Sequence, residues 1–106
     1  MSATFSILNT GKVYRALTKD IGGKGVCLVM EEELELGTPL AVEMTLPDRQ
    51  TPVAFVGDVV WSTLLIEASS RLRHPPVETG VRFVSINPKD RTLIMQYTRL
   101  NALPSL

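Results

Sequence analysis

A glycine-rich stretch at residues 19–25 brings together groups that can bind a small ligand. Its sequence is Lys19-Asp20-Ile21-Gly22-Gly23-Lys24-Gly25. Three glycines fall within four residues, and one carboxylate and two ammonium groups stand among them. Glycine can adopt a positive φ, and it lets a ligand approach the main chain closely. The stretch therefore indicates either a loop that binds a ligand or a tight connection between two strands that binds none.

This loop is not expected to hold phosphate in the manner of a P-loop. Lys24 is followed by Gly25, where the P-loop motif has serine or threonine. The stretch also precedes an apolar run of strand length, whereas phosphate-binding glycine loops open a helix.

Groups suited to catalysis or metal binding are sparse. Cys27 and His74 are the only cysteine and histidine, and they lie in different kinds of segment. We interpret Cys27 as a buried thiol. The consecutive acids Glu31, Glu32 and Glu33 are interpreted as a solvated connector, because adjacent carboxylates do not converge on one ion. We therefore expect a binding domain that is not an enzyme and has no cofactor or metal.

Length and composition favour one cytoplasmic domain, residues 1–106. Of the 106 residues, 44% are hydrophobic, and 11 basic residues balance 11 acidic ones. Binding of nucleic-acid polymers relies on a net positive field and is not expected. No apolar run reaches the roughly 18 residues of a membrane span, and the first residues lack the pattern of a signal peptide. A single cysteine suits a reducing compartment.

Six short stretches predict β-strands, since each alternates or is continuously apolar over a strand length. They are residues 4–8, 12–18, 26–30, 38–46, 51–62 and 78–85. No helix intervenes between them, which excludes parallel β-α-β units. The turn after the first strand ends in Gly11, which is free to take a left-handed conformation. The pattern favours an all-β fold, either a small antiparallel barrel or a strongly curved sheet.

The longest strand, residues 51–62, is apolar on both faces, so we expect it to be central or covered on both sides. Val53, Phe55, Val59 and Trp61 share one face. Gly57, in mid-strand, indicates a bend, a bulge or a close approach of another backbone.

Residues 63–77 are harder to interpret. Residues 64–66 are compatible with an extension of the preceding strand, and residues 68–76 indicate a long loop. Arg71, Arg73 and His74 form a small basic cluster in that loop. A solvated loop tip and a contact with a partner or an anionic ligand both remain open.

A helix is expected from Asn87 to about Asn101, capping the sheet. Asn87 is suited to the N-cap and Pro88 to the first helical position. Asp90 complements the positive end of the helix dipole. Apolar residues recur at helical spacing and form one stripe, made of Leu93, Ile94, Tyr97 and Leu100.

Taken in order, five segments of the chain resemble a PilZ domain over nearly the whole length. They are residues 18–28, residues 36–47, Gly57-Asp58-Val59-Val60-Trp61, Thr79-Gly80-Val81-Arg82-Phe83 and Asn87-Pro88-Lys89-Asp90-Arg91. The first is similar to the family's D/N-x-S-x-x-G segment. The resemblance implies a six-stranded antiparallel β-barrel with a C-terminal helix, and a bacterial signal-transduction domain that binds the nucleotide cyclic di-GMP.

The same resemblance implies which residues bind the nucleotide. The motif positions carried over are Asp20, Gly22 and Gly25. An aspartate can accept hydrogen bonds from the N1–H and N2–H₂ edge of guanine, and glycines let that edge approach the backbone. The family's second motif, an N-terminal R-x-x-x-R, supplies guanidinium groups that pair with guanine or phosphate.

The chain departs from the family pattern at two places. Gly22 stands where the family has serine, which removes a hydroxyl. No R-x-x-x-R precedes Asp20, since Arg15 is the only arginine there. Loss of two bidentate arginines at about 1–3 kcal/mol each predicts binding weakened by roughly 30-fold to 10⁴-fold. Lys12, Arg15 and Lys24 are expected to supply charge to the phosphates, although lysine cannot reproduce the guanidinium fork.

Two hypotheses account for the missing arginine motif. In one, the chain is a fragment of a longer protein, and the arginine arm lies upstream of Met1. In the other, it is a PilZ variant that does not bind nucleotide and acts as a protein-interaction adaptor in motility or pilus regulation. In either case a protein partner is expected.

Overall fold

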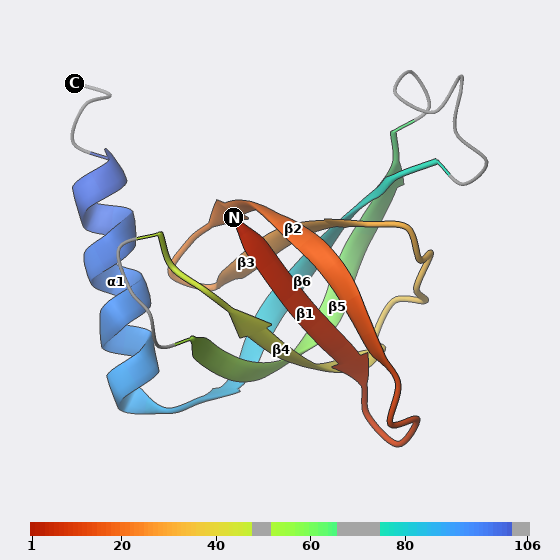
Figure 1. Cartoon of the computed structure of the whole chain (residues 1–106), viewed down its shortest axis with the longest axis horizontal. Coiled ribbons are helices and arrows are strands. Elements are labelled where there is room, and N and C mark those ends of the chain that lie inside the picture. The colour runs from red at the N-terminus through yellow and green to blue at the C-terminus, as the bar shows by residue number, and fades with distance from the viewer. Residues whose placement is uncertain (48–51, 66–74, 103–106) are drawn as a thin grey trace.

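Six antiparallel strands close into a barrel, and one helix follows them (Figure 1). The computed structural model describes residues 1–47, 52–65 and 75–102. The elements are β1 Ser2–Ile7, β2 Val13–Ile21, β3 Gly25–Met30, β4 Pro39–Met44, β5 Val53–Leu64, β6 Val77–Ile86 and α1 Pro88–Ala102. Around the barrel the strand order is β1-β2-β3-β6-β5-β4. The expected all-β barrel with a C-terminal helix is confirmed.

One expectation falls outside the described residues, namely the basic cluster of Arg71, Arg73 and His74. Residue 64 extends β5, in agreement with the interpretation of residues 64–66 as an extension of that strand.

The barrel interior is filled by the inward side chains of alternating strands. Every second residue of β3 is buried, and β4 shows the same alternation. Phe5, Leu28, Leu40 and Met44 are almost completely buried. Burial of one such side chain contributes about 1.5–3 kcal/mol to the free energy of unfolding. The predicted period of two therefore corresponds to a real division between a dry interior and a solvated exterior.

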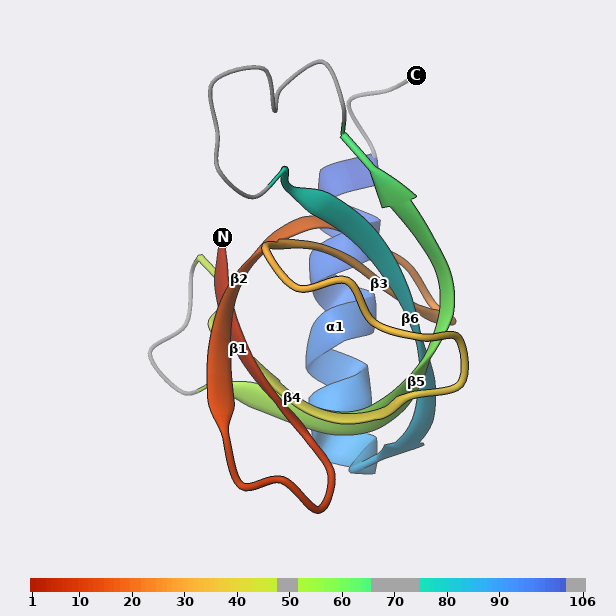
Figure 2. The same cartoon turned by 90° about the vertical axis from the view of Figure 1, so that its right-hand side faces the viewer.

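Helix α1 covers one end of the barrel. Viewed along the barrel in Figure 2, α1 runs behind the ring of strands, and the connection between β3 and β4 passes across the end that faces the viewer. Ile94 of α1 is buried in the core, and Leu93 and Tyr97 pack against it. The predicted apolar stripe is confirmed for these three residues, whereas the side chain of Leu100 lies outside the description.

The start of α1 has the cap that the sequence indicates. The backbone N–H of Lys89 donates to Oδ1 of Asn87 at 2.8 Å. Oδ2 of Asp90 accepts a hydrogen bond from the backbone N–H of Ala54 at 3.2 Å, which ties the first turn of the helix to β5. The cap and this contact together set where the helix crosses the barrel end.

Replacing Asn87 with alanine is expected to lower the free energy of unfolding by about 1 kcal/mol, because the N–H of Lys89 loses its side-chain acceptor. Urea denaturation followed by circular dichroism measures this change. Gln96→Ala, at an exposed position within α1, is the control and should leave the midpoint almost unchanged. Equal midpoints for the two variants would show that the cap contributes nothing.

The expected loop at residues 19–25 is longer than the connection in the structure, so its predicted length is wrong. β2 continues to Ile21 and β3 begins at Gly25, so only residues 22–24 connect the two strands. A β-bulge accounts for the difference. Thr18 pairs with Leu28, but the next partner of β3, Cys27, pairs with Asp20. The extra residue, Lys19, leaves two successive side chains exposed without ending the strand.

Of the two alternatives expected for β5, the central position is confirmed, because β5 is flanked by β4 and β6. It is not covered on both faces, since Val60 and Trp61 on its outer side are exposed. The pairing with β6 shifts between Val59 and Trp61. This shift removes Trp61 from the buried row of Val53, Phe55 and Val59. The predicted irregularity at Gly57 is confirmed, because a Cβ there would lie 2.3 Å from the carbonyl oxygen of Arg82.

Candidate functional site

A groove on the outside of the barrel collects four of the predicted site residues. Asp20, Gly22, Lys24 and Gly25 all line it. We call it the glycine-turn groove. Its remaining lining comes from Gly23, Val26, Cys27, Val60, Trp61, Gly80, Val81 and Arg82. Its volume is about 600 Å³, which falls within the range of small-molecule sites.

Strand register places the groove's side chains in rows. Asp20 of β2 pairs with Cys27 of β3, Cys27 pairs with Gly80 of β6, and Gly80 pairs with Trp61 of β5. These positions form one outward row across four strands. Since neighbouring strands lie about 4.8 Å apart, the row spans roughly 14 Å. A carboxylate therefore stands at one end of the groove and an indole at the other.

The indole of Trp61 lies directly over Gly80. A Cβ on Gly80 would come within 2.1 Å of Nε1 of Trp61, so only glycine leaves room for the ring. Trp61 is nevertheless 43% exposed. Part of the ring thus remains free to stack on a ligand.

The next outward row carries an oriented arginine. Arg82 pairs with Gly25 on one side and with Asp58 on the other. Its guanidinium donates from Nε to Oδ1 of Asp58 at 3.2 Å and from Nη2 to Oδ2 at 2.9 Å. These hydrogen bonds, and the charge of Asp58, raise the pKa of Arg82 above its usual value. The pair fixes the direction of the guanidinium, and 60% of the Arg82 side chain stays exposed.

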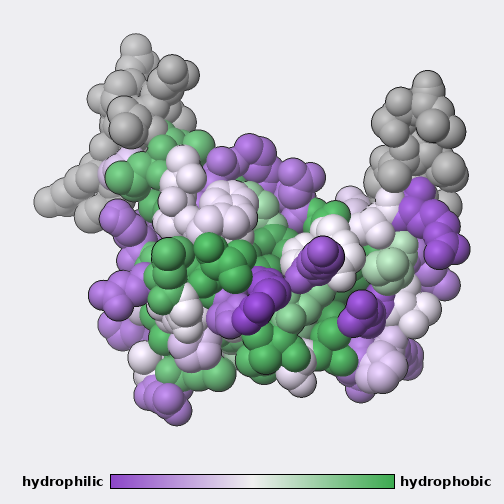
Figure 3. All heavy atoms as spheres, turned by 180° about the vertical axis from the view of Figure 1, so that it is seen from behind, coloured by the Kyte–Doolittle hydropathy of each residue, from purple (hydrophilic) through white to green (hydrophobic). Residues whose placement is uncertain are grey.

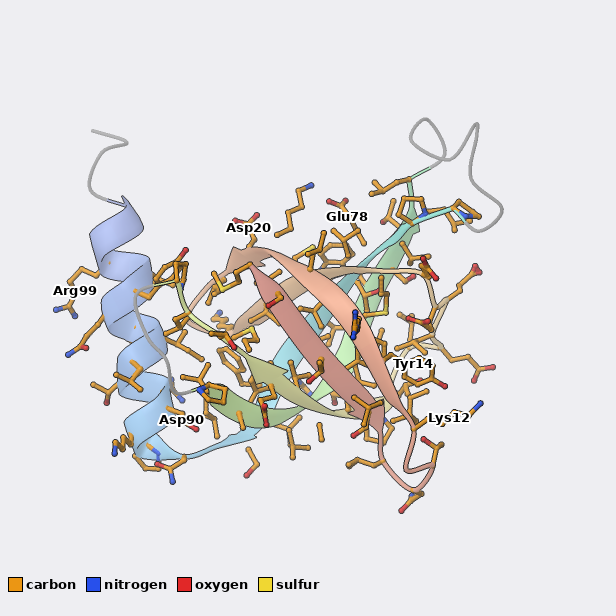
Figure 4. The ribbon with its side chains drawn as sticks, in the orientation of Figure 1. Lys12, Tyr14, Asp20, Glu78, Asp90 and Arg99 are labelled. Atoms are coloured by element: carbon orange, nitrogen blue, oxygen red, sulfur yellow. The ribbon has the colours of Figure 1, made fainter. Side chains whose placement is uncertain are left out.

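A second ion pair borders the groove. Lys19, the bulge residue, pairs with Glu78 of β6, and Figure 4 shows Glu78 and Asp20 along the same upper side of the barrel. The hydrogen bond and charge of Glu78 raise the pKa of Lys19. Of the two lysines of the stretch, Lys24 lines the groove itself and Lys19 does not.

Cys27 is partly buried in the middle of the groove, which modifies the expectation of a fully buried thiol. Burial raises the pKa of the Cys27 thiol, and the nearby carboxylate of Glu78 adds to the effect. The neutral thiol therefore predominates at neutral pH.

Alkylation of Cys27 by iodoacetamide is expected to need a higher pH than alkylation of free cysteine. The thiolate is the nucleophile, and a raised pKa lowers the thiolate fraction at any pH below that pKa. Glu78→Gln removes a negative charge, so it should lower the pKa and speed alkylation at fixed pH. Mass spectrometry gives both rates. Glu43→Gln, at an exposed position of β4, should not change the rate; equal acceleration by both variants would contradict the assignment.

The glycines of the stretch differ in what they do. None of Gly22, Gly23 and Gly25 has a positive φ; Gly11 does, at 72°, as predicted. The glycines of the stretch therefore do not adopt the left-handed backbone conformation that their residue type allows. A Cβ on Gly25 would lie 2.1 Å from the carbonyl oxygen of Val81, whereas one on Gly22 would meet only the oxygen of Gly25, at 3.9 Å. Gly25 is required by strand packing, and Gly22 is not.

The structure does not bring Lys12 and Arg15 to the glycine-turn groove. Lys12 precedes β2 and Asp20 lies near its other end, so about 25 Å of extended strand separates them; Figure 4 shows the two at opposite ends. Arg15 lines a separate groove of about 780 Å³, together with acidic residues that include Glu32 and Glu43.

Two groove residues, Trp61 and Arg82, are not found by the sequence pattern. Alternation alone assigns Trp61 to a buried face, and it marks Arg82 only as the polar half of a strand. Register between β5, β6 and β3 is what brings them to Asp20. The signal that could have placed Trp61 is the presence of a glycine, Gly80, on another strand, since an indole that lies over a neighbouring strand needs a position without a side chain.

Within residues 1–47, 52–65 and 75–102, no group of three or more His, Cys, Asp or Glu side chains is placed to hold a metal ion. Over the same ranges, no helix has both the length and the apolar character needed to cross a membrane.

Comparison with known families agrees with this architecture. A family model described as the PilZ domain matches residues 1–100. The chain belongs to the PilZ domain family. PilZ domains are regulatory binding domains, and the family is generally associated with cyclic di-GMP. No match was found among the curated proteins or among the solved structures. The D/N-x-S-x-x-G segment of this PilZ domain spans the end of β2, the turn and the start of β3.

Proposed function

We propose that this PilZ domain binds cyclic di-GMP in the glycine-turn groove and acts as a regulatory domain in the bacterial cytoplasm. The observation that carries the proposal is the outward row from Asp20 to Trp61, with Arg82 in the adjacent row. A diguanylate ligand needs an acceptor for a guanine edge, a surface for a base and cations for its phosphates. The groove contains one carboxylate, one aromatic ring and two cations, Lys24 and Arg82.

Each residue has a proposed role. Asp20 accepts hydrogen bonds from N1–H and N2–H₂ of one guanine. The exposed part of Trp61 stacks on a base, which contributes about 1–3 kcal/mol in other nucleotide-binding proteins. Arg82 and Lys24 face phosphate. Arg82 suits this role because Asp58 already orients its guanidinium, so less side-chain entropy is lost on binding.

Lys12 and Arg15 have no part in this arrangement, because they lie away from the groove. The charge that they were expected to supply is assigned instead to Lys24 and Arg82. The prediction of weakened binding, made from the missing R-x-x-x-R, still applies to this chain.

Calorimetric titration with cyclic di-GMP tests the proposal. The nucleotide concentration should reach about 1 mM, because even a millimolar Kd corresponds to a binding free energy of about −4 kcal/mol. The chain also contains two probes of the groove, since Trp61 is its only tryptophan and Cys27 its only cysteine. Binding should change the fluorescence of Trp61 and slow the alkylation of Cys27. GMP is the control ligand. Heat of binding without protection of Cys27 would place the ligand elsewhere, and no response in any longer native form of the protein would refute nucleotide binding.

Gly22→Ser restores the serine of the family motif, and it is expected to raise affinity for cyclic di-GMP. The site has room for a Cβ, and one added hydrogen bond is worth about 0.5–1.5 kcal/mol, or roughly two- to tenfold in Kd. Gly22→Ala supplies the Cβ without the hydroxyl and should leave Kd unchanged. Equal Kd values for the two variants would show that no ligand atom reaches this position.

An adaptor function remains the alternative, and one observation favours it. Large apolar side chains, among them Leu36 and Leu64, are exposed beside the outer face of β5. Titration of any longer native form of the protein separates the two functions, because an adaptor that does not bind nucleotide gives no heat and no protection of Cys27 in that form either.

A further inference from the structure

A second groove runs along the outer side of β5, next to the glycine-turn groove. It is lined by Glu33, Leu34, Glu35, Leu36, Val60, Trp61, Ser62 and Leu64, and its volume is about 690 Å³. We call it the Leu36 groove. Four of its apolar side chains are unusually exposed: Leu36 at 69%, Val60 at 44%, Trp61 at 43% and Leu64 at 42%. The back view of Figure 3, the side on which β5 and β6 lie, shows apolar side chains gathered between polar ones.

Among the residues that the structure describes, the charged side chains lining the Leu36 groove are all acidic. They are Glu33 and Glu35, and no lysine or arginine of the described part lines the groove. Among the described residues, neither carboxylate forms an ion pair. Glu31 and Glu32 precede them in the same connection between β3 and β4. The groove therefore combines an apolar floor with a negatively charged wall.

The wall of the groove is held in place by the barrel. The N–H of Gly37 donates to the carbonyl oxygen of Val59 at 2.7 Å, and the N–H of Val59 donates to the oxygen of Thr38 at 3.1 Å. The Thr38 hydroxyl donates to the carbonyl oxygen of Glu35 at 2.6 Å. Gly37 takes a φ of 87° to make this turn. Leu36 is thus presented by a fixed turn, and a partner would lose little free energy in ordering it.

We propose that the Leu36 groove docks a segment of a partner protein that carries apolar anchor side chains flanked by lysine or arginine. The anchors pack against Leu36, Val60 and Leu64. The basic residues face Glu33 and Glu35, which raises the association rate and selects against acidic segments. Apolar anchors in the centre and charged pairs at the rim are the usual arrangement of a protein interface.

Charge argues against two other occupants. A second copy of this chain bound about a two-fold axis would bring its own glutamates against Glu33 and Glu35, because a two-fold contact pairs a surface with itself. Membranes rich in anionic lipid attract basic surfaces and repel this one. A basic partner segment satisfies both the apolar and the acidic parts of the groove.

This docking does not depend on nucleotide binding, but the two grooves share Val60 and Trp61. An occupant of either groove therefore contacts the same indole. Trp61, as the only tryptophan, also reports on docking through its fluorescence.

Selection from a phage library of short random peptides, with the whole chain as bait, tests the proposal. The counter-selection bait is the double variant Leu36→Ser/Leu64→Ser, which changes only exposed side chains. We expect enriched peptides to contain apolar residues flanked by lysine or arginine. A synthetic copy of the most enriched peptide should change Trp61 fluorescence on titration. Its Kd should rise about tenfold or more in the double variant, as for loss of central anchors.

Two further variants test whether the peptide binds in the Leu36 groove itself. Glu33→Lys/Glu35→Lys should weaken the same peptide, and Val13→Ser, an exposed apolar residue on β2, should not. No enrichment over the double variant, or enrichment of acidic peptides, overturns the proposal. So does a wild-type dimer in sedimentation that the double variant lacks, since a second copy would then be the occupant. The double variant should still bind cyclic di-GMP, because Leu36 and Leu64 do not line the glycine-turn groove. Loss of peptide binding in this variant is then not caused by damage to the nucleotide site.

Discussion

Replacing Gly25 with alanine is expected to lower the free energy of unfolding by about 2–4 kcal/mol, a large part of the 5–15 kcal/mol typical of a domain. The added Cβ would lie 2.1 Å from the carbonyl oxygen of Val81 and 3.0 Å from Cα of Arg82. Both are backbone atoms, so the clash can be relieved only by moving β3 away from β6. Urea denaturation followed by Trp61 fluorescence measures the loss.

Gly22→Ala is the matched control for this prediction. The two glycines flank the same turn, and the N–H of Gly22 donates to the carbonyl oxygen of Gly25 at 2.9 Å. A Cβ at Gly22 meets nothing closer than 3.9 Å, so this variant should unfold within about 0.5 kcal/mol of the wild type. Equal stability of the two variants would mean that β3 and β6 are not as closely paired as the structure shows.

Asp20→Ala is expected to weaken cyclic di-GMP binding by about 30-fold to 700-fold. The range corresponds to about 2–4 kcal/mol for two hydrogen bonds from a guanine edge to a charged acceptor. The side chain is exposed, so the free energy of unfolding should change by less than about 0.5 kcal/mol. Calorimetry or NMR titration of both proteins gives the ratio of Kd values.

Glu43→Ala provides the comparison for Asp20→Ala. Glu43 is also an exposed acid, but it lines the separate groove that contains Arg15. Its removal changes the net charge by the same amount and should leave Kd within about twofold, because exposed charges beyond a Debye length are screened. If both variants weaken binding equally, Asp20 acts through overall charge and makes no specific contact with guanine.

The strands and the helix were predictable because their signals are local. Alternation in residues 38–46 marked β4, and the Asn87-Pro88 pair marked the start of α1. The length of the connection at residues 19–25 was not predictable in the same way. Glycines indicate a loop when read alone, but here Gly25 belongs to a strand. The bulge at Lys19 depends on the pairing between β2 and β3, and no residue type in β2 indicates a bulge.

Only the part of the candidate site that is contiguous in the sequence was predictable. Residues 20–25 are a local motif, and the structure keeps them together. Trp61 and Arg82 join them across strands that are distant in sequence. Lys12 and Arg15 illustrate the converse error, because nearness in sequence to Asp20 suggested nearness in space. An extended strand separates its residues by about 3.3 Å each, so five or eight positions place a side chain beyond the groove.

Closure of the barrel has a consequence for how the domain avoids unwanted association. Each of the strands β1 to β6 is paired on both sides, so the sheet offers no edge of free N–H and C=O groups to a strand from another chain. Edge-to-edge pairing is a common route to aggregation, which open sheets block with charges, prolines or bulges. Here the closure itself protects the backbone. The outer side chains are therefore not needed to prevent edge-to-edge pairing, and an apolar residue such as Leu64 can remain exposed at the end of β5.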